Sequence, residues 1–121
     1  MKILCVDDNV HLLSMLAKSL DAEGHQVELA FDGEQALSLL ATNPERFDLM
    51  ITDSKMPRLD GFGLVERARK TGFNGKLFVF ASGLTSDEGS RYQALGVERV
   101  FDKPANRELL DAVRQLNQPP K

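Results

Sequence analysis

The sequence has few of the features that mark secreted, membrane or disulfide-bonded proteins. It contains one cysteine, Cys5, among 121 residues, so no disulfide can form within the chain. Cys5 lies in the apolar run 3–6, where a buried and inert thiol is expected. No apolar run approaches the ~20 residues of a transmembrane helix, and the amino terminus lacks the pattern of a signal peptide. These absences favour a cytoplasmic protein that does not contact a membrane.

Positive charge is also scarce. The 15 Lys and Arg residues are outnumbered by 18 Asp and Glu, which gives a net charge of −3. Proteins that bind a nucleic-acid backbone carry clustered basic residues to neutralise its phosphates. We therefore expect no nucleic-acid binding by this domain alone.

What the sequence does contain is a regular alternation of short apolar runs and longer amphipathic stretches. Strands are predicted at residues 3–6, 26–30, 49–52, 77–81 and 98–101. Several of these runs are continuously apolar, which is typical of parallel strands covered on both faces. Helices are predicted between and after them, the fourth opening on a capping box at Thr85. Residues 1–121 are thus predicted to form a single α/β domain, with 118–121 as a tail or the start of a linker.

Polar side chains directly follow four of the predicted strands. Asp7 and Asp8 follow the first, Asp53 the third, Ser82 the fourth and Lys103 the fifth. Ligands of open α/β sheets bind beyond the carboxyl ends of the strands, so these residues should converge on one cleft. Taken singly, Asp8 could cap a helix, Lys103 could be a surface charge and Ser82 a loop hydroxyl. Their joint placement favours a site.

Three carboxylates in one cleft repel one another. Two like charges ~4 Å apart cost roughly 4 kcal/mol at an effective dielectric constant near 20. Either one of them is protonated or a cation lies among them. An all-oxygen site with open positions suits Mg²⁺, and a carboxylate beside that ion can attack phosphorus.

Four stretches carry a resemblance to a known family. They are residues 3–8 (ILCVDD), 48–57 (DLMITDSKMP) with Asp60-Gly61, 81–83 (ASG) and 102–104 (DKP). In order and spacing they resemble the receiver domain of bacterial response regulators, of the chemotaxis-regulator kind, in two-component systems. The resemblance covers almost the whole chain. It implies a (βα)5, flavodoxin-like, doubly wound parallel sheet of strand order 2-1-3-4-5.

The resemblance also implies roles for individual residues. Asp53 would accept a phosphoryl group from a sensor histidine kinase or a histidine phosphotransfer protein. Mg²⁺, or Mn²⁺ in its place, would be bound by Asp8, Asp53 and the backbone carbonyl of Lys55, with Asp7 acting through water. Such a domain catalyses only its own phosphorylation and slow dephosphorylation, so it is a signalling domain rather than an enzyme.

Further implied roles concern phosphoryl binding and switching. Ser82 and Lys103 would each contact a phosphoryl oxygen, and the peptide bond before Pro104 is expected to be cis. Phosphorylation would draw Ser82 inward and shift the surface of helix four, strand five and helix five. That surface would act on an output partner or effector domain that the sequence does not identify. The domain would be a monomer or a phosphorylation-dependent dimer.

One position departs from the family pattern. The family usually has Tyr or Phe three residues before the lysine, where this sequence has Val100. The neighbouring Phe101 should point to the other side of the strand. Since valine cannot make the ring movement, coupling is either weaker or depends on backbone shifts and on Phe101 or Tyr92.

Four other residues have two interpretations each. Lys55 and Leu84 lie two residues beyond Asp53 and Ser82, where related domains tune phosphate lifetime, although both could be plain loop residues. His11 and His25 could form a phosphohistidine or bind metal, but solvated histidines are the better interpretation.

Two alternative functions fit the sequence less well. A phosphatase with an Asp nucleophile, of the haloacid-dehalogenase type, usually has Asp-x-Asp and a cap domain, whereas this strand ends Asp53-Ser54-Lys55. A pseudo-receiver interaction module typically lacks the acidic pair, the acceptor or the lysine, all of which are present here.

Overall fold

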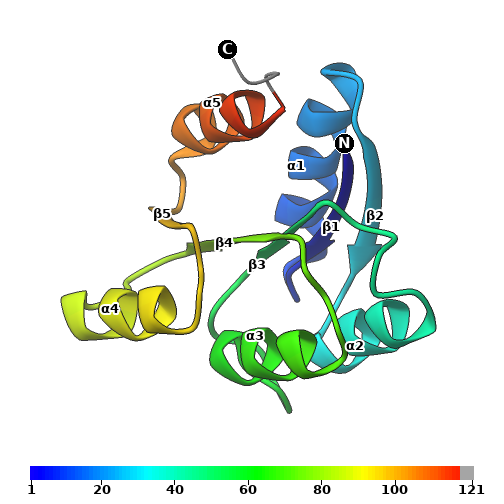
Figure 1. Ribbon diagram of the computed structural model, residues 1–121. Helices are drawn as coiled ribbons and strands as arrows, with labels where there is room; N and C mark the ends of the chain where they lie inside the picture. The colour runs from blue at the N-terminus through cyan, green and yellow to red at the C-terminus, as the bar shows by residue number, and fades with distance from the viewer. Residues whose placement is uncertain (118–121) are drawn as a thin grey trace.

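The computed structural model describes residues 1–117, in which five strands and five helices alternate along the chain (Figure 1). The strands are β1 (Lys2–Val6), β2 (Gln26–Ala30), β3 (Leu49–Thr52), β4 (Lys76–Ala81) and β5 (Arg99–Asp102). The helices are α1 (Val10–Ala22), α2 (Gly33–Thr42), α3 (Gly61–Lys70), α4 (Ser86–Ala94) and α5 (Asn106–Leu116). Each predicted strand is present with its ends within one residue of the prediction. The tail predicted at 118–121 lies outside the described residues.

The strands form one parallel sheet in the order β2-β1-β3-β4-β5, which confirms the predicted topology. All strands run in the same direction, so their carboxyl ends meet at one edge of the sheet. Strand β2 lies on one side of β1 and β3 lies on the other, so the strand order reverses there. Ligands of open α/β sheets bind at such a reversal. The register pairs Val6 with Thr52, and the residues that follow them, Asp7 and Asp53, therefore start side by side.

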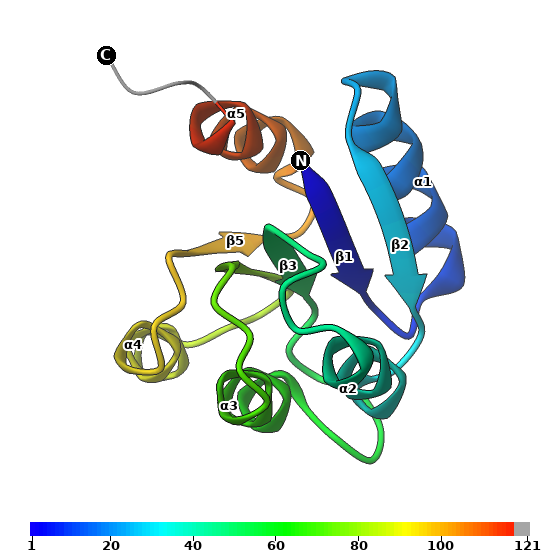
Figure 2. The ribbon, with the colours of Figure 1, turned by 45° about the vertical axis from the view of Figure 1, so that its right-hand side comes forward.

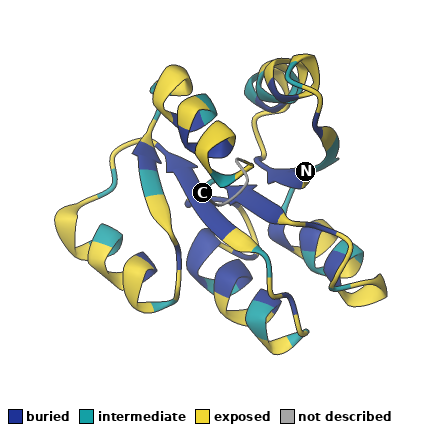
Figure 3. Cartoon of the chain, turned by 45° about the horizontal axis from the view of Figure 1, so that its top comes forward, coloured by how far each residue is buried: buried dark blue, intermediate teal, exposed yellow. Residues whose placement is uncertain are grey.

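Helices cover both faces of the sheet (Figure 2). Helices α1 and α5 lie over one face, and α2, α3 and α4 over the other. Side chains alternate along each strand, so that Ile3 and Cys5 face α1 and α5 while Leu4 and Val6 face the other layer. Figure 3 shows the consequence: the strands are largely buried and the helices expose their outer faces. No helix among residues 1–117 is long and apolar enough to cross a membrane.

Side chains at the helix starts fix where the chain leaves the sheet. Thr85 and Glu88 form the predicted capping box of α4, with both reciprocal hydrogen bonds in place. Helix α1 is capped by Asn9, whose side chain accepts a hydrogen bond from the Leu12 amide. The suggestion that Asp8 caps this helix is therefore wrong.

The two histidines differ in their surroundings. His11 is exposed on α1, as predicted. His25 was predicted to be solvated but is buried, because the turn after Gly24 places its ring against the start of β1. Its Nδ1 lies 3.1 Å from the Met1 amine. Burial lowers the pKa of His25, and the charge of this amine lowers it further. Cys5 is buried as predicted, and burial raises its pKa to about 12.

Candidate functional site

Three aspartates meet at the carboxyl edge of the sheet. Carboxylate oxygens of Asp7, Asp8 and Asp53 all lie within 4.8 Å of one another. Asp7 is buried, Asp53 is half-buried and Asp8 is exposed. The Asp53 amide donates to the Val6 carbonyl at 2.9 Å, which holds the end of β3 against the end of β1. The convergence predicted from the strand ends is thus found for all three acids.

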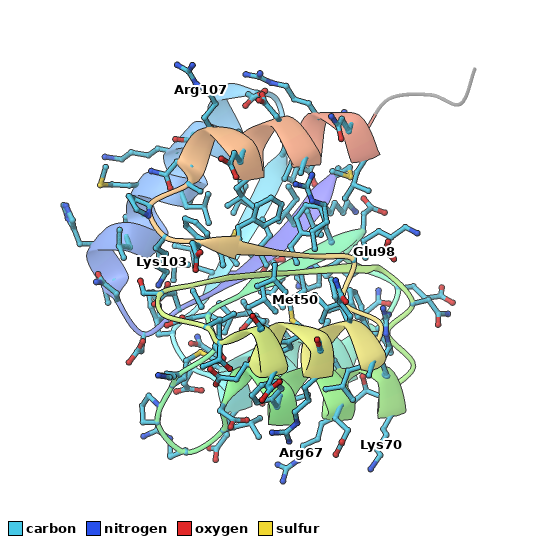
Figure 4. The ribbon with its side chains drawn as sticks, turned by 90° about the vertical axis from the view of Figure 1, so that its left-hand side faces the viewer. Met50, Arg67, Lys70, Glu98, Lys103 and Arg107 are labelled. Atoms are coloured by element: carbon cyan, nitrogen blue, oxygen red, sulfur yellow. The ribbon has the colours of Figure 1, made fainter. Side chains whose placement is uncertain are left out.

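Lys103 places a cation inside this acidic cluster. Its Nζ lies 2.7 Å from Asp7 Oδ2 and 3.6 Å from Asp53 Oδ1. The Lys103 amide donates to the Ala81 carbonyl, which fixes the residue at the end of the β4–β5 pair. Figure 4 shows Lys103 and Glu98 at opposite ends of β5, so the lysine belongs to the carboxyl edge. The peptide bond between Lys103 and Pro104 is cis, as predicted.

Asp53 occupies an electrostatically strained position in this cluster. Burial raises the pKa of its carboxyl above the ordinary value, and the charge of Asp7 raises it further. Lys103 and the Ser54 amide act in the opposite direction, the amide donating to Asp53 Oδ1 at 2.8 Å. A second cation among these oxygens would relieve the remaining repulsion. Mg²⁺ prefers oxygen ligands and is usually bound by one or two carboxylates together with water. The acidic cluster therefore fits a divalent metal.

The other predicted residues lie around the same edge. Ser82 is exposed just beyond β4, and Lys55 is exposed just beyond Ser54. Leu84 is half-buried and packs on the core beneath α2, α3 and α4. Val100 packs on that same core, whereas Phe101 packs on the core beneath α1 and α5. The prediction that Phe101 faces away from Val100 is therefore confirmed.

One contact beside the acidic cluster was missed in the sequence analysis. The Ser54 hydroxyl and the Tyr92 hydroxyl lie 2.6 Å apart and are both buried. Ser54 follows Asp53 directly, and Tyr92 comes from α4. The sequence offers one signal, a lone tyrosine on the apolar side of an otherwise polar helix. Its partner cannot be read from the sequence, because 38 residues separate the two.

Tyr92 should ionise far above the usual range. Burial raises its pKa to about 12, against about 10 for an exposed tyrosine. The stability contributed by its neutral form is therefore complete below about pH 10 and is lost as the pH rises through the folded value. The chain has one Tyr and no Trp, so tyrosinate absorbance reports this residue alone. We expect native absorbance to stay flat through pH 10 while the urea-unfolded chain titrates there; a native rise near pH 10 would contradict the buried contact.

Fold and site together define a receiver-type signalling domain, a doubly wound parallel sheet with an acidic cluster and a lysine at its carboxyl edge. The model of the response regulator receiver domain family matches residues 3–114. The chain belongs to that family and is a receiver domain of a two-component response regulator.

Individual relatives agree with this assignment. The chain is 37% identical over 116 residues to the transcriptional regulatory protein CpxR of Klebsiella pneumoniae, covering 95% of this chain and 48% of that protein. It is 36% identical over 117 residues to the response regulator MprA of Mycobacterium avium, covering 96% and 50%. The chain thus spans about half the length of these curated relatives.

Solved structures show the same fold. The receiver domain of the Francisella response regulator 1452 has a TM-score of 0.86 and 28% identity, over 95% of this chain and 94% of that one. The chemotaxis protein CheY4 of Vibrio cholerae has a TM-score of 0.86 and 27% identity, over 94% and 96%.

Proposed function

We propose that this domain accepts a phosphoryl group on Asp53 from a phosphohistidine of a sensor histidine kinase or a histidine phosphotransfer protein. The observation that carries the proposal is the convergence of three carboxylates and one lysine at the carboxyl edge of the sheet. Asp53 is the acceptor in this proposal because it lies at the end of a central strand, within reach of both the acids and the lysine.

The transfer is a displacement at phosphorus. A carboxylate oxygen of Asp53 forms a bond to phosphorus while the bond between phosphorus and the histidine nitrogen breaks, and that nitrogen keeps the electron pair. Negative charge spreads over the three equatorial oxygens in the transition state. Lys103, already 3.6 Å from Asp53 Oδ1, lies where it can neutralise one of them, and the exposed Ser82 hydroxyl can donate to another.

The reaction is proposed to require Mg²⁺, for which Mn²⁺ can substitute. Asp8, Asp53 and the backbone carbonyl of Lys55 would hold the ion, with Asp7 acting through water. When bound, Mg²⁺ offsets the charge of the acids and of the phosphoryl oxygens. Asp7 suits an indirect role because Lys103 and the Asn9 amide already occupy its two carboxylate oxygens, at 2.7 and 2.9 Å.

Phosphorylation would then alter the surface formed by α4, β5 and α5. The acyl phosphate carries about −1.5 to −2 charges beside Ser82, in place of the single negative charge of the carboxylate, and adds acceptor oxygens there; both changes favour a shift of the loop between β4 and α4. That surface would act on an output domain or partner, as monomer or phosphorylation-dependent dimer. The curated relatives are about twice as long as this chain, which leaves room in them for an output domain.

Metal dependence tests the proposed chemistry. Incubation with acetyl phosphate and Mg²⁺ should add the mass of one phosphoryl group to the intact chain, and excess EDTA should suppress the gain. Uptake that is equally fast in EDTA would contradict the metal role.

Leu84 and Lys55 flank the path by which water would reach the acyl phosphate. We expect Leu84→Asn to change the half-life of phosphorylated protein severalfold, since an amide can position water where the apolar side chain excludes it. The decay of the phosphorylated mass after removal of acetyl phosphate measures this half-life. A half-life equal to that of the wild type would mean that Leu84 only packs the loop.

A further inference from the structure

A buried contact joins α4 to the loop between β3 and α3 (residues 53–60), which is called the acceptor loop because it begins with Asp53. Ser54 Oγ and Tyr92 OH lie 2.6 Å apart, which is a short hydrogen bond between two hydroxyls. Tyr92 is fully buried and Ser54 is 2% exposed, so water does not compete for the bond. Among the described residues, no buried side-chain nitrogen or oxygen lacks a partner. Breaking this bond without a replacement would leave two buried hydroxyls unsatisfied.

Packing around Tyr92 leaves its hydroxyl little freedom. Its ring stacks on Phe62 with centroids 4.0 Å apart and planes 16° from parallel, and Arg91 lies over the Phe62 ring. On the other side the hydroxyl lies against Gly61, so close that a Cβ atom on this glycine would collide with it. The Gly61 amide in turn donates to the Ser54 carbonyl at 2.7 Å. The described contacts therefore leave little room for Ser54 to shift without Tyr92.

Ser54 is also bound directly to the acceptor. Its amide donates to Asp53 Oδ1 at 2.8 Å, while its hydroxyl binds Tyr92. Phosphorylation changes the charge of the Asp53 oxygens and the direction in which they accept hydrogen bonds. One residue thus senses the acceptor through its backbone and contacts α4 through its side chain. Val100, at the position where the family has an aromatic ring, provides no hydroxyl for such a contact.

We propose that the hydroxyl pair of Ser54 and Tyr92 transmits the phosphorylation state of Asp53 to α4. The proposal rests on the proposed function, since it needs phosphorylation at Asp53. Ser54 and Tyr92 are positioning residues: neither contacts the phosphoryl group through its side chain. In the free domain the pair holds α4 against the acceptor loop. When Asp53 is phosphorylated, the Ser54 amide follows the altered carboxylate oxygens, and the hydroxyl pair carries the shift to the middle of α4.

Hydrogen–deuterium exchange of α4 tests the route. Samples of the wild type, Tyr92→Phe, Ser54→Ala and the double variant are compared with and without acetyl phosphate and Mg²⁺, and intact mass is recorded for each. We expect every variant to gain the phosphoryl group. The phosphorylation-dependent change in α4 exchange should fall about threefold in each single variant. In the double variant this change should be no smaller than in the single variants, because the two hydroxyls act as one unit.

A matched control removes a hydroxyl elsewhere. Thr71 Oγ1 donates to the Ala68 carbonyl at 2.6 Å, at the far end of α3, and Thr71→Val should retain the full α4 response. An unchanged α4 response in phosphorylated Tyr92→Phe and Ser54→Ala would overturn the route and leave the acceptor chemistry standing. Failure of a folded Tyr92→Phe to take up phosphate would also overturn it, since the pair would then serve the chemistry itself. If the wild type gains no mass, the proposed function fails, and the route with it.

Discussion

Replacing Gly61 with alanine should lower the free energy of unfolding by about 3 kcal/mol. A Cβ atom at this position would lie 2.7 Å from the Asp53 carbonyl oxygen and 3.0 Å from the Ser54 Cα, and would collide with the Tyr92 hydroxyl. Two of these three neighbours are backbone, so they cannot move aside as a flexible side chain does. The hydrogen bond from the Gly61 amide to Ser54 keeps the two segments together. Urea unfolding measures the loss.

The matched control is Gly89→Ala on α4. A Cβ atom there meets nothing within 4 Å, so this variant should be more stable than the wild type by about 0.5–1 kcal/mol. Adding Tyr92→Phe to Gly61→Ala should recover part of the lost stability, because it removes one of the colliding atoms. If Gly61→Ala has the same free energy of unfolding as the wild type, the segment from Ser54 to Gly61 can accommodate a Cβ atom, and the predicted collision is wrong.

Removing the charge of Lys103 should produce the second large effect. We expect the free energy of unfolding of Lys103→Met in EDTA to be about 2–3 kcal/mol lower than that of the wild type. The substitution leaves Asp7 and Asp53 without their cation in a mostly buried site. The Lys103 side chain is 13% exposed. Saturating Mg²⁺ should close much of the gap, since a bound cation then takes over the compensation. The measurement is urea unfolding of both proteins with and without the metal.

An exposed lysine at the other edge of the sheet provides the comparison. Lys76 lies 3.7 Å from Glu98 with its side chain 56% exposed, and Lys76→Met should change stability by less than about 0.5 kcal/mol in either condition. If Lys103→Met matched the wild type in EDTA, or if Mg²⁺ stabilised both equally, Lys103 would not be the cation that balances the acidic cluster.

The sequence predicted the parts of this molecule that follow from local pattern. Apolar runs with turn signals between them predicted every strand, and parallel strands bring their carboxyl ends together. The placement of Asp7, Asp53 and Lys103 at one edge followed from that rule alone. The family resemblance added the strand order and the cis bond at Pro104.

The structural features that the sequence did not predict depend on contacts between distant residues. The Ser54–Tyr92 pair is set by how α3 and α4 lie on the sheet, which no local pattern specifies. His25 was misjudged for the same reason, because its burial is produced by packing against the start of β1 rather than by its neighbours in the chain. Asp8 was a candidate for the cap of α1 because aspartate favours the N-cap position. Asn9, one residue further on, favours it equally and is the residue that caps the helix.

The central claim is that Asp53 is the phosphoryl acceptor, and the most direct test compares intact masses of the wild type and Asp53→Asn after incubation with acetyl phosphate and Mg²⁺. The account predicts that the wild type gains the mass of one phosphoryl group and that Asp53→Asn gains none. Asparagine keeps the size of the side chain and removes the nucleophilic carboxylate, so folding should be retained. A gain that persists in Asp53→Asn would place the acceptor elsewhere, and no gain in the wild type would contradict the claim outright.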